Sequence, residues 1–185
     1  MKINVKKLLP FILTFVVILL DQITKALIVK NIPPFSIGYQ FCGDLLRIVH
    51  VANTGVAFSM GDAMPFVIRR ILFGIVPLIV IAVVIAVYFR NDEFTGVQRW
   101  AICGIIGGGL GNIIDRFFRA EGVVDFIDVK FFGIFGLKRW PTFNVADSAV
   151  VICGFMLIIS FIVVTVRSKK VKSDSKTENS EGKND

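Results

Sequence analysis

The sequence predicts a membrane protein of the all-α class, with four transmembrane helices and both termini in the cytoplasm. The 185 residues are 55% hydrophobic, with a mean hydropathy of +0.74, which exceeds the usual apolar share of soluble domains. Four apolar segments are each long enough to span a hydrocarbon core, which takes about 20 helical residues. Basic residues gather at the chain ends and at the edges of these segments. The length is typical of a single domain.

The predicted spans follow one another along the chain at residues 8–29, 71–89, 100–118 and 143–166. The first is interpreted as a retained span rather than a signal peptide, because no small-residue cleavage site follows it. Residues 1–166 therefore form one integral membrane domain. Residues 167–185 are rich in Ser, Lys, Glu and Asn, and we expect them to form a disordered basic and polar cytoplasmic tail.

The distribution of charge sets the expected orientation. MKINVKK at one end and RSKKVKSDSK near the other are basic, which favours a cytoplasmic location for both termini. The outer loops are then 30–70 and 119–142, which carry 8 basic residues against 11 on the cytoplasmic side. The first of these loops is too long for a plain connection. LLRIVHV at 45–51 predicts a short strand within it, and GDAMPFVIRR at 61–70 is expected to lie along the interface.

Composition also argues against several other classes of protein. The net charge of +7 arises where membrane proteins keep Lys and Arg, so nucleic-acid binding is not expected. Three cysteines without metal-like spacing predict neither a disulfide framework nor a zinc site. A single histidine, His50, leaves little material for a His-based catalytic centre.

Polar residues recur at one depth in three of the spans. Four of them lie about 18 to 24 Å from the cytoplasmic ends of their helices, at 1.5 Å of rise per residue: Asp21, Asn112, Asp115 and Asp147. Ionisable groups inside a membrane are costly unless they are paired, and they predict a functional site by default. We therefore predict a polar site that opens outward in the outer third of the bilayer.

The charged residues of these motifs also have structural interpretations. In one interpretation, Asp21 and Lys25 of DQITK form an i,i+4 pair that serves only to neutralise both charges. Asp115 and Arg116 would similarly form an ion pair. Both interpretations stay open for the first pair, whereas a role in the site is favoured for Asn112 and Arg116.

Three further motifs have structural interpretations of their own. Asn144 and Asp147 in TFNVADS suit a helix N-cap. On spacing alone, NTGVAF at 53–58 is interpreted as a turn. The glycines of GGGLGNIIDRF at 107–117 allow close helix packing.

An aspartate pair is the hydrolytic centre that this composition leaves. Two nearby aspartates share one proton, so that one acts as a base on water while the other polarises a carbonyl. Asp125 before the fourth span and Asp147 within it meet this requirement, although spacing alone does not separate Asp125 from Asp128. The alternative is a small ion- or proton-coupled transporter, which would usually have more spans or internal repeats.

Five stretches resemble the bacterial lipoprotein signal peptidase (signal peptidase II) family of membrane aspartyl proteases. They occur in family order: DQITK (21–25), NTGVAF (53–58), GGGLGNIIDRF (107–117), VVDFIDV (123–129) and FNVADS (143–148). The resemblance implies an intramembrane endopeptidase that removes signal peptides from prolipoproteins just before the diacylglyceryl-modified cysteine. It also implies a four-helix bundle with a small extracytoplasmic β-element and an interfacial helix.

By position, Asp125 and Asp147 match the catalytic pair of the family, which selects Asp125 over Asp128. The substrate-binding or supporting positions correspond to Asn53, Gly55, Asn112, Arg116, Asn144, Asp21, Gln22, Lys25 and Asp115. NTGVAF then becomes a motif of the site rather than a plain turn. The chain departs from the family in a longer second outer loop around KFFGIFGLKRW, at residues 130–140.

The resemblance also implies partners and a location. The family needs no metal or cofactor. Its partners are diacylglyceryl-modified prolipoproteins and membrane lipids, and globomycin-type peptides inhibit it. We expect a monomer in the bacterial cytoplasmic (inner) membrane, with the active site near the extracytoplasmic face.

Overall fold

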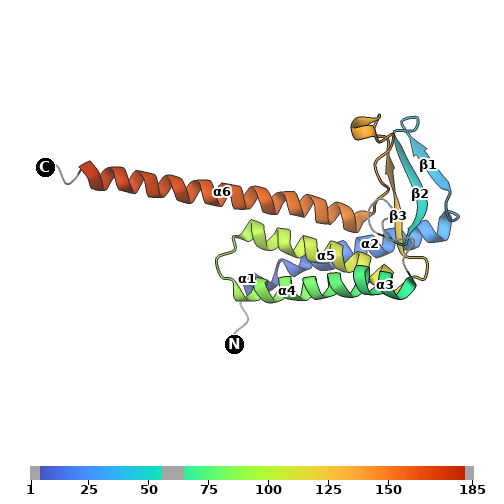
Figure 1. The fold of residues 1–185 in the computed structure, drawn as a ribbon, viewed down its shortest axis with the longest axis horizontal. Coiled ribbons are helices and arrows are strands. Elements are labelled where there is room, and N and C mark those ends of the chain that lie inside the picture. The colour runs from blue at the N-terminus through green and yellow to red at the C-terminus, as the bar shows by residue number, and fades with distance from the viewer. Residues whose placement is uncertain (1–4, 56–64, 182–185) are drawn as a thin grey trace.

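The computed structural model describes residues 5–55 and 65–181. Long helices lie beside one another, and a small sheet stands at one end of them (Figure 1). Four helices in the described part of the chain are long and apolar enough to cross a membrane: Val5–Asn31, Val67–Arg90, Gly96–Phe118 and Val145–Lys169. The prediction of four spans is confirmed, and the chain is a multi-pass membrane protein.

Two of these spans, the first and the second, are built from more than one element. The helices are α1 (Val5–Leu8), α2 (Phe11–Asn31), α3 (Phe66–Arg70), the π-helix η2 (Ile71–Ile75), α4 (Val76–Arg90), α5 (Gly96–Phe118) and α6 (Val145–Glu181), with the short 3-10 helix η3 (Ile134–Gly136). The break between α1 and α2 falls at Pro10. The π-helix directly precedes Pro77 at the start of α4, where the missing N–H interrupts the helical hydrogen-bond ladder.

Helix α5 is the centre of the bundle and packs against α2, α4 and α6. In its most apolar stretch 56% of residues are buried, against 22%, 17% and 11% in the first, second and fourth spans. Those three spans therefore direct most of their apolar side chains outward, as lipid contact requires. The start of α5 is fixed by a capping box, in which Thr95 and Gln98 bond each other's backbone N–H.

Glycines let the other helices approach α5 closely. A Cβ at Gly108 would collide with the Ala146 carbonyl of α6, and one at Gly111 would lie 2.8 Å from Oδ2 of Asp21 in α2. The packing interpretation of the GGGLG stretch is confirmed. These contacts also bring the polar residues of α2 and the start of α6 to the same level of α5.

A small sheet joins the segment between the first two spans to the segment between the last two. Its three antiparallel strands have the order β1 (Ile37–Phe41), β2 (Leu46–Asn53), β3 (Val123–Val129). The strand predicted at 45–51 is confirmed as β2, but β3 was not predicted. The burial of Val123 through Phe126 in succession explains this, because a strand covered on both faces lacks the alternation of polar and apolar residues that reveals strands.

Two predicted segments differ from the structure or lie partly outside it. Helix α6 continues to Glu181, so residues 167–181 are helical where we predicted a disordered tail. Nothing in the Lys-, Ser- and Glu-containing sequence breaks a helix that is already propagating from the span. Of the segment at 61–70, residues 61–64 lie outside the described part of the chain, and α3 runs directly into the second span.

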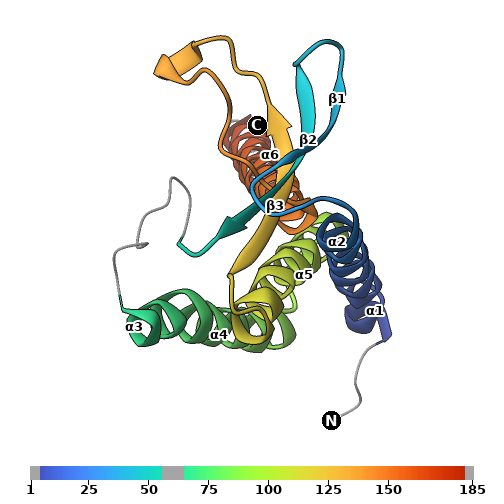
Figure 2. The ribbon, with the colours of Figure 1, turned by 90° about the vertical axis from the view of Figure 1, so that its right-hand side faces the viewer.

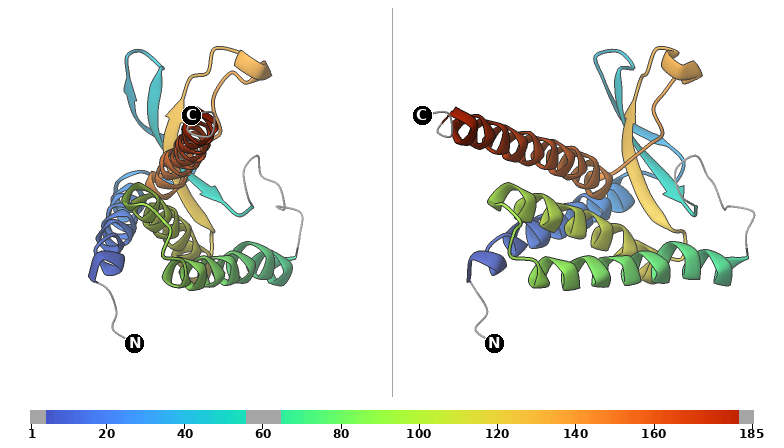
Figure 3. Two further views of the ribbon diagram at one scale, coloured as in Figure 1. Left: turned by 90° about the vertical axis from the view of Figure 1, so that its left-hand side faces the viewer. Right: turned by 60° about the vertical axis from the view of Figure 1, so that its left-hand side comes forward.

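The ends of the bundle differ in character. Helix α1 and the distal part of α6 lie at one end, and the sheet lies at the other (Figures 1 and 3). Viewed along the helices from the sheet end, the sheet does not cap the bundle but extends to one side of it (Figure 2). The polar residues of the spans meet where the sheet joins the helices.

Candidate active site

A cavity of about 730 Å³ lies where β3, α5 and α6 converge. One part of its lining is polar and includes Asn53, Asn112, Arg116, Asp125 and Asp147. Another part is apolar and includes Trp140, Phe143, Val151 and Ile152. The cavity therefore has hydrogen-bonding groups on one side and an apolar surface on the other.

Asp125 is positioned by β3 and by two amide donors. Its Oδ2 accepts from Nδ2 of Asn53 at 2.8 Å, and its Oδ1 accepts from Nδ2 of Asn144 at 2.8 Å. Asp125 is only 2% exposed. Burial, with a smaller contribution from the charge of Asp147, raises the pKa of Asp125 to about 7, although the two amide bonds oppose the rise. This carboxyl group is therefore close to half protonated at neutral pH.

Asp147 is positioned by the first turn of α6. Its Oδ1 accepts from Nδ2 of Asn112 at 2.7 Å, and its Oδ2 accepts from the backbone N–H of Asn144 at 3.2 Å. In return, Oδ1 of Asn144 accepts from the backbone N–H of Asp147 at 2.9 Å. The N-cap interpretation is thus confirmed, and the capping bonds hold the carboxylate at the cavity wall.

Two amides connect the two acids. Nδ2 of Asn144 donates both to Asp125 and to Oδ1 of Asn112, the latter at 3.0 Å. The other end of Asn112 donates to Asp147. The result is a chain from Asp125 through Asn144 and Asn112 to Asp147, in which each acid keeps lone pairs for a ligand in the cavity.

A second polar cluster lies immediately behind this chain. Nζ of Lys25 is 2.8 Å from Oδ2 of Asp21 and 2.8 Å from Oδ2 of Asp115, and all three side chains are fully buried. The same Nζ donates to Oδ1 of Asn112 at 2.9 Å. The predicted i,i+4 contact between Asp21 and Lys25 is confirmed, and Asp115 is a further partner of the same ammonium group. Lys25 thereby links this closed cluster to the cavity.

The closed cluster also fixes the elements that carry the two acids. Oδ1 of Asp21 accepts from the N–H of Ala146 at the start of α6, at 3.0 Å. Oδ2 of Asp115 accepts from the N–H of Val124 in β3, at 3.3 Å. Nε2 of Gln22 donates to Oδ1 of Asp115 at 3.2 Å. The cluster therefore sets the position of Asp147 and Asp125 through the backbone of their neighbours.

The alternative interpretation of Asp115 and Arg116 as an ion pair does not agree with the structure. Asp115 instead pairs with Lys25 and with Nε of Arg119 at 2.9 Å. The side chains of adjacent helical residues point about 100° apart, so they do not face each other and cannot pair well. Arg116 turns toward the cavity, where it donates to the Gly55 carbonyl and stacks at 5.3 Å from the Phe73 ring.

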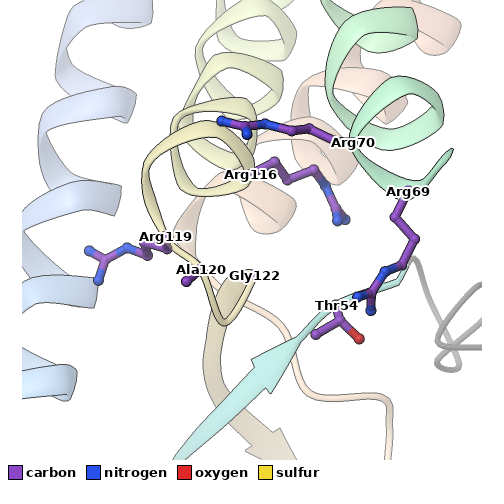
Figure 4. A pocket seen from close by; sticks show the side chains of 7 residues that line it. All are labelled: Thr54, Arg69, Arg70, Arg116, Arg119, Ala120 and Gly122. Atoms are coloured by element: carbon purple, nitrogen blue, oxygen red, sulfur yellow. The ribbon is translucent and has the colours of Figure 1, made fainter. Parts of the chain in front are cut away.

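Arg116 also belongs to a basic group beside the main cavity. A smaller hollow of about 40 Å³ is lined by Thr54, Ala120, Gly122 and four arginines: Arg69, Arg70, Arg116 and Arg119. In Figure 4, Arg69 and Arg70 come from α3, while Arg116 comes from α5 and Arg119 directly follows that helix. The flank of the site that faces β2 and α3 is therefore strongly positive.

Asp128 and His50 do not line the cavity. Asp128 is buried and accepts from Nε of Arg139 at 2.6 and 2.7 Å, so it does not simply face water. Nδ1 of His50 lies 2.8 Å from the Ile32 carbonyl, within hydrogen-bonding distance. Of NTGVAF, residues 56–58 lie outside the described part of the chain. In that described part, no group of three or more His, Cys, Asp or Glu side chains could hold a metal ion.

Sequence reasoning missed the apolar wall of the cavity. Trp140 and Phe143 come from the segment before α6, and Val151 and Ile152 come from α6 itself. Val151 follows Asp147 by one helical turn and so shares its face, which is a signal that was present in the sequence. Trp140 and Phe143 carried no comparable signal, because their position depends on how the loop folds back.

The model of the family Peptidase_A8, described as signal peptidase (SPase) II, matches residues 13–163. The lipoprotein signal peptidase of Treponema pallidum (strain Nichols) is 52% identical over 161 residues, which is 87% of this chain and 87% of that protein. The lipoprotein signal peptidase of Treponema denticola is 49% identical over 164 residues, with coverage of 89% and 94% respectively.

Solved structures give the same result for the fold. One bacterial membrane enzyme, determined by the in meso method at 2.3 Å resolution, matches with a TM-score of 0.71 at 26% identity, over 84% of this chain and 88% of that chain. Another, determined at 1.9 Å by the same method, matches with a TM-score of 0.69 at 26% identity, over 82% and 91%. The structural similarity therefore extends over more than four fifths of this chain.

Proposed function

The chain belongs to the signal peptidase II family, and we propose that it removes signal peptides from prolipoproteins as an aspartic endopeptidase. The family model and the curated relatives support this hydrolase function. None of these comparisons supports the transporter alternative. We further propose that the scissile bond lies just before a cysteine that carries a diacylglyceryl group.

The single observation that carries the proposed mechanism is the pair Asp125 and Asp147 on one cavity wall, joined through two amides. The acids come from separately anchored elements, β3 and α6. Because burial raises the pKa of Asp125 to about 7, we assign the shared proton to Asp125 and the role of base to Asp147.

In the proposed reaction, Asp147 takes a proton from a water molecule as the water oxygen attacks the scissile carbonyl. Protonated Asp125 donates a hydrogen bond to the carbonyl oxygen and stabilises the charge that develops there. The tetrahedral intermediate then collapses, and the C–N bond breaks as its nitrogen takes up the proton that Asp147 had removed from water, which returns Asp147 to its carboxylate form. The products are a signal peptide with a new carboxylate and a lipoprotein with a free α-amino group.

The other site residues act on binding and alignment in this proposal. Asn53, Asn112 and Asn144 hold the two carboxyl groups in place, while Arg116 and Gly55 form the edge that contacts the peptide backbone. Asp21, Gln22, Lys25 and Asp115 act from behind as support. The wall formed by Trp140, Phe143, Val151 and Ile152 suits the diacylglyceryl chains, because apolar surface is removed from water there.

The location follows from the same arrangement. We propose that the chain lies in the bacterial cytoplasmic (inner) membrane with both termini in the cytoplasm, which is supported by the helix ends that lie together opposite the sheet (Figure 1). The sheet and the site then lie near the extracytoplasmic face, at the level of the lipid headgroups. Membrane lipids, a monomeric state and inhibition by globomycin-type peptides are further parts of the proposal.

The test is cleavage by the purified protein in lipid vesicles. We expect it to cut a prolipoprotein that carries diacylglyceryl cysteine and to leave the unmodified prolipoprotein intact. A parallel measurement of proton and cation flux in the same vesicles tests the alternative. Flux without cleavage would contradict the proposed function. Equal cleavage of the two substrates would contradict the proposed role of the diacylglyceryl group.

A further inference from the structure

The tip of the outer sheet presents large apolar side chains to its surroundings. Residues 131–137, FFGIFGL, form a turn between β3 and α6, which we call the aromatic tip. Phe132 is 71% exposed, Ile134 51% and Phe135 90%. Grouped apolar side chains on a surface mark an interaction site, because contact with water is unfavourable for all of them at once.

The aromatic tip is an organised turn. The N–H of Phe131 donates to the Lys138 carbonyl at 2.9 Å, and the N–H of Gly133 donates to the Leu137 carbonyl at 2.9 Å. Phe132 and Phe135 both have φ of 54°, in the left-handed region that is unfavourable for a residue with a side chain. Both Phe132 and Phe135 thus have an unfavourable backbone conformation, and both rings are exposed.

The position of the tip identifies its surroundings. Seen from the side, η3 within the tip is level with the start of α6 and not beyond it (Figure 1). In both views close to the helix direction, η3 lies outside the outline of the helices (Figures 2 and 3). In a protein with four spans, the space at this level beside α6 is the outer leaflet. Ile152 and Phe155 in the first half of α6 are also exposed, at 59% and 63%.

The base of the tip carries the residues that favour the boundary between lipid and water. Lys130 pairs with Asp44 at 2.7 Å and lies 5.6 Å from the Phe132 ring. Lys138 is exposed, and Trp140 is 43% exposed. Basic residues and Trp above an apolar surface match phosphate headgroups above acyl chains. This charge pattern favours a lipid partner over a protein partner.

We propose that the aromatic tip inserts into the outer leaflet beside α6 and anchors the outer sheet to the membrane surface. The consequence for the site follows from the chain path, since β3 carries Asp125 and the tip joins β3 to α6, which carries Asp147. Anchoring would set the height of Asp125 relative to the bilayer. The inference goes beyond the proposed reaction, because contact with lipid can be measured without any cleavage.

The first test measures that contact directly. Cys42 is the exposed native cysteine, while Cys103 and Cys153 are buried, so a Cys42→Ser background suits site-specific labelling. Phe135→Cys receives an environment-sensitive fluorophore, and the protein is placed in vesicles of phosphatidylcholine and phosphatidylglycerol, with or without lipid that carries a nitroxide near the headgroup. The matched control is Gln40→Cys on the exposed strand β1.

We expect nitroxide lipid to quench the label at position 135 strongly and the label at position 40 weakly. Equal quenching at the two positions, or quenching of the label at position 135 by aqueous iodide alone, would overturn the proposal. The vesicles contain no other protein, so a tip that serves a protein partner would give the second result.

The second test uses the proposed activity. The double variant Phe132→Ser with Phe135→Ser is compared with wild type in vesicles and in detergent micelles, and Tyr39→Ser with Phe41→Ser on β1 serves as the control. We expect a several-fold loss of cleavage rate in vesicles and little change in micelles. An equal loss in both media would show a structural defect and contradict anchoring. If wild type cleaves nothing, the proposed function fails while the quenching result still decides the anchor.

Discussion

Two neighbouring pairs of acids in this protein differ in the groups that contact their carboxylates. In the closed cluster, Asp21 and Asp115 both contact the ammonium of Lys25, and all three residues are fully buried. In the catalytic pair that we propose, Asp125 and Asp147 contact neutral amides from asparagines. The groups lie next to each other, because Asn112 bonds both Lys25 and Asp147.

This difference in partners distinguishes the structural role of the closed cluster from the catalytic role that we propose for Asp125 and Asp147. A cation beside a carboxylate supplies an opposite charge, whereas an amide orients a carboxylate without supplying one. Burial can therefore raise the pKa of Asp125 to about 7 and make its proton available. Ionisable residues in a membrane are thus not all equivalent, and the type of partner distinguishes the two roles.

The largest effect on stability should come from removing the Lys25 ammonium, which distinguishes the closed cluster from the proposed catalytic pair. Lys25→Met leaves buried Asp21 without its cation and buried Asp115 with Arg119 alone, and we expect a loss of about 3 to 5 kcal/mol in the free energy of unfolding. Thermal unfolding in detergent measures the change. Lys30→Met, at an exposed position of the same helix, should be nearly neutral. Equal melting of the two variants would show that the closed cluster is not a structural element.

A smaller effect is expected from loosening the amide chain. Asn144→Ser keeps an N-cap acceptor for α6 but loses the amide donors to Asp125 and Asn112. We expect cleavage to fall roughly 10²-fold, because misplacement of a catalytic group by about 1 Å has that cost, while the melting temperature changes little. Asn31→Ala, outside the site, is the control. Wild-type activity in Asn144→Ser would remove the amide chain from the mechanism.

The smallest effect is a shift in pH dependence. If Asp125 must be protonated, kcat/KM should decline as pH rises through about 7, where this group loses its proton. The bond from Asn53 lowers the pKa of Asp125, so its removal in Asn53→Ala should raise the pKa and move the decline to higher pH. A pH–rate profile measures this shift, and movement toward lower pH would contradict the assignment of the proton.

The spans and their polar layer could be predicted from the sequence because both depend on local chemistry. Long apolar runs give the helices, and the i,i+4 spacing gives the Asp21–Lys25 contact. The N-cap at Asn144 and Asp147 follows from residue type in the same way. For the catalytic pair, residue spacing left Asp125 and Asp128 equivalent, and the family resemblance was needed to choose between them.

The features that could not be predicted depend on contacts between distant segments. Strand β3 lacks alternation because both of its faces are covered. The partners of Asp115 are Lys25, 90 positions earlier, and Arg119, whereas the sequence offered the adjacent Arg116. The apolar wall from Trp140 and Phe143 depends likewise on a loop that folds back over the start of α6.

The most direct test of the central claim is cleavage of a diacylglyceryl-modified prolipoprotein by Asp125→Asn and Asp147→Asn, with Asp128→Asn as the control. Asp128 is bonded to Arg139 and does not line the cavity. We predict that both of the first two variants lose activity by about 10⁴-fold or more, as groups that act as a unit do, while all three stay folded and Asp128→Asn remains active. Substantial cleavage by either of the first two variants, or loss of cleavage in folded Asp128→Asn alone, would contradict the account.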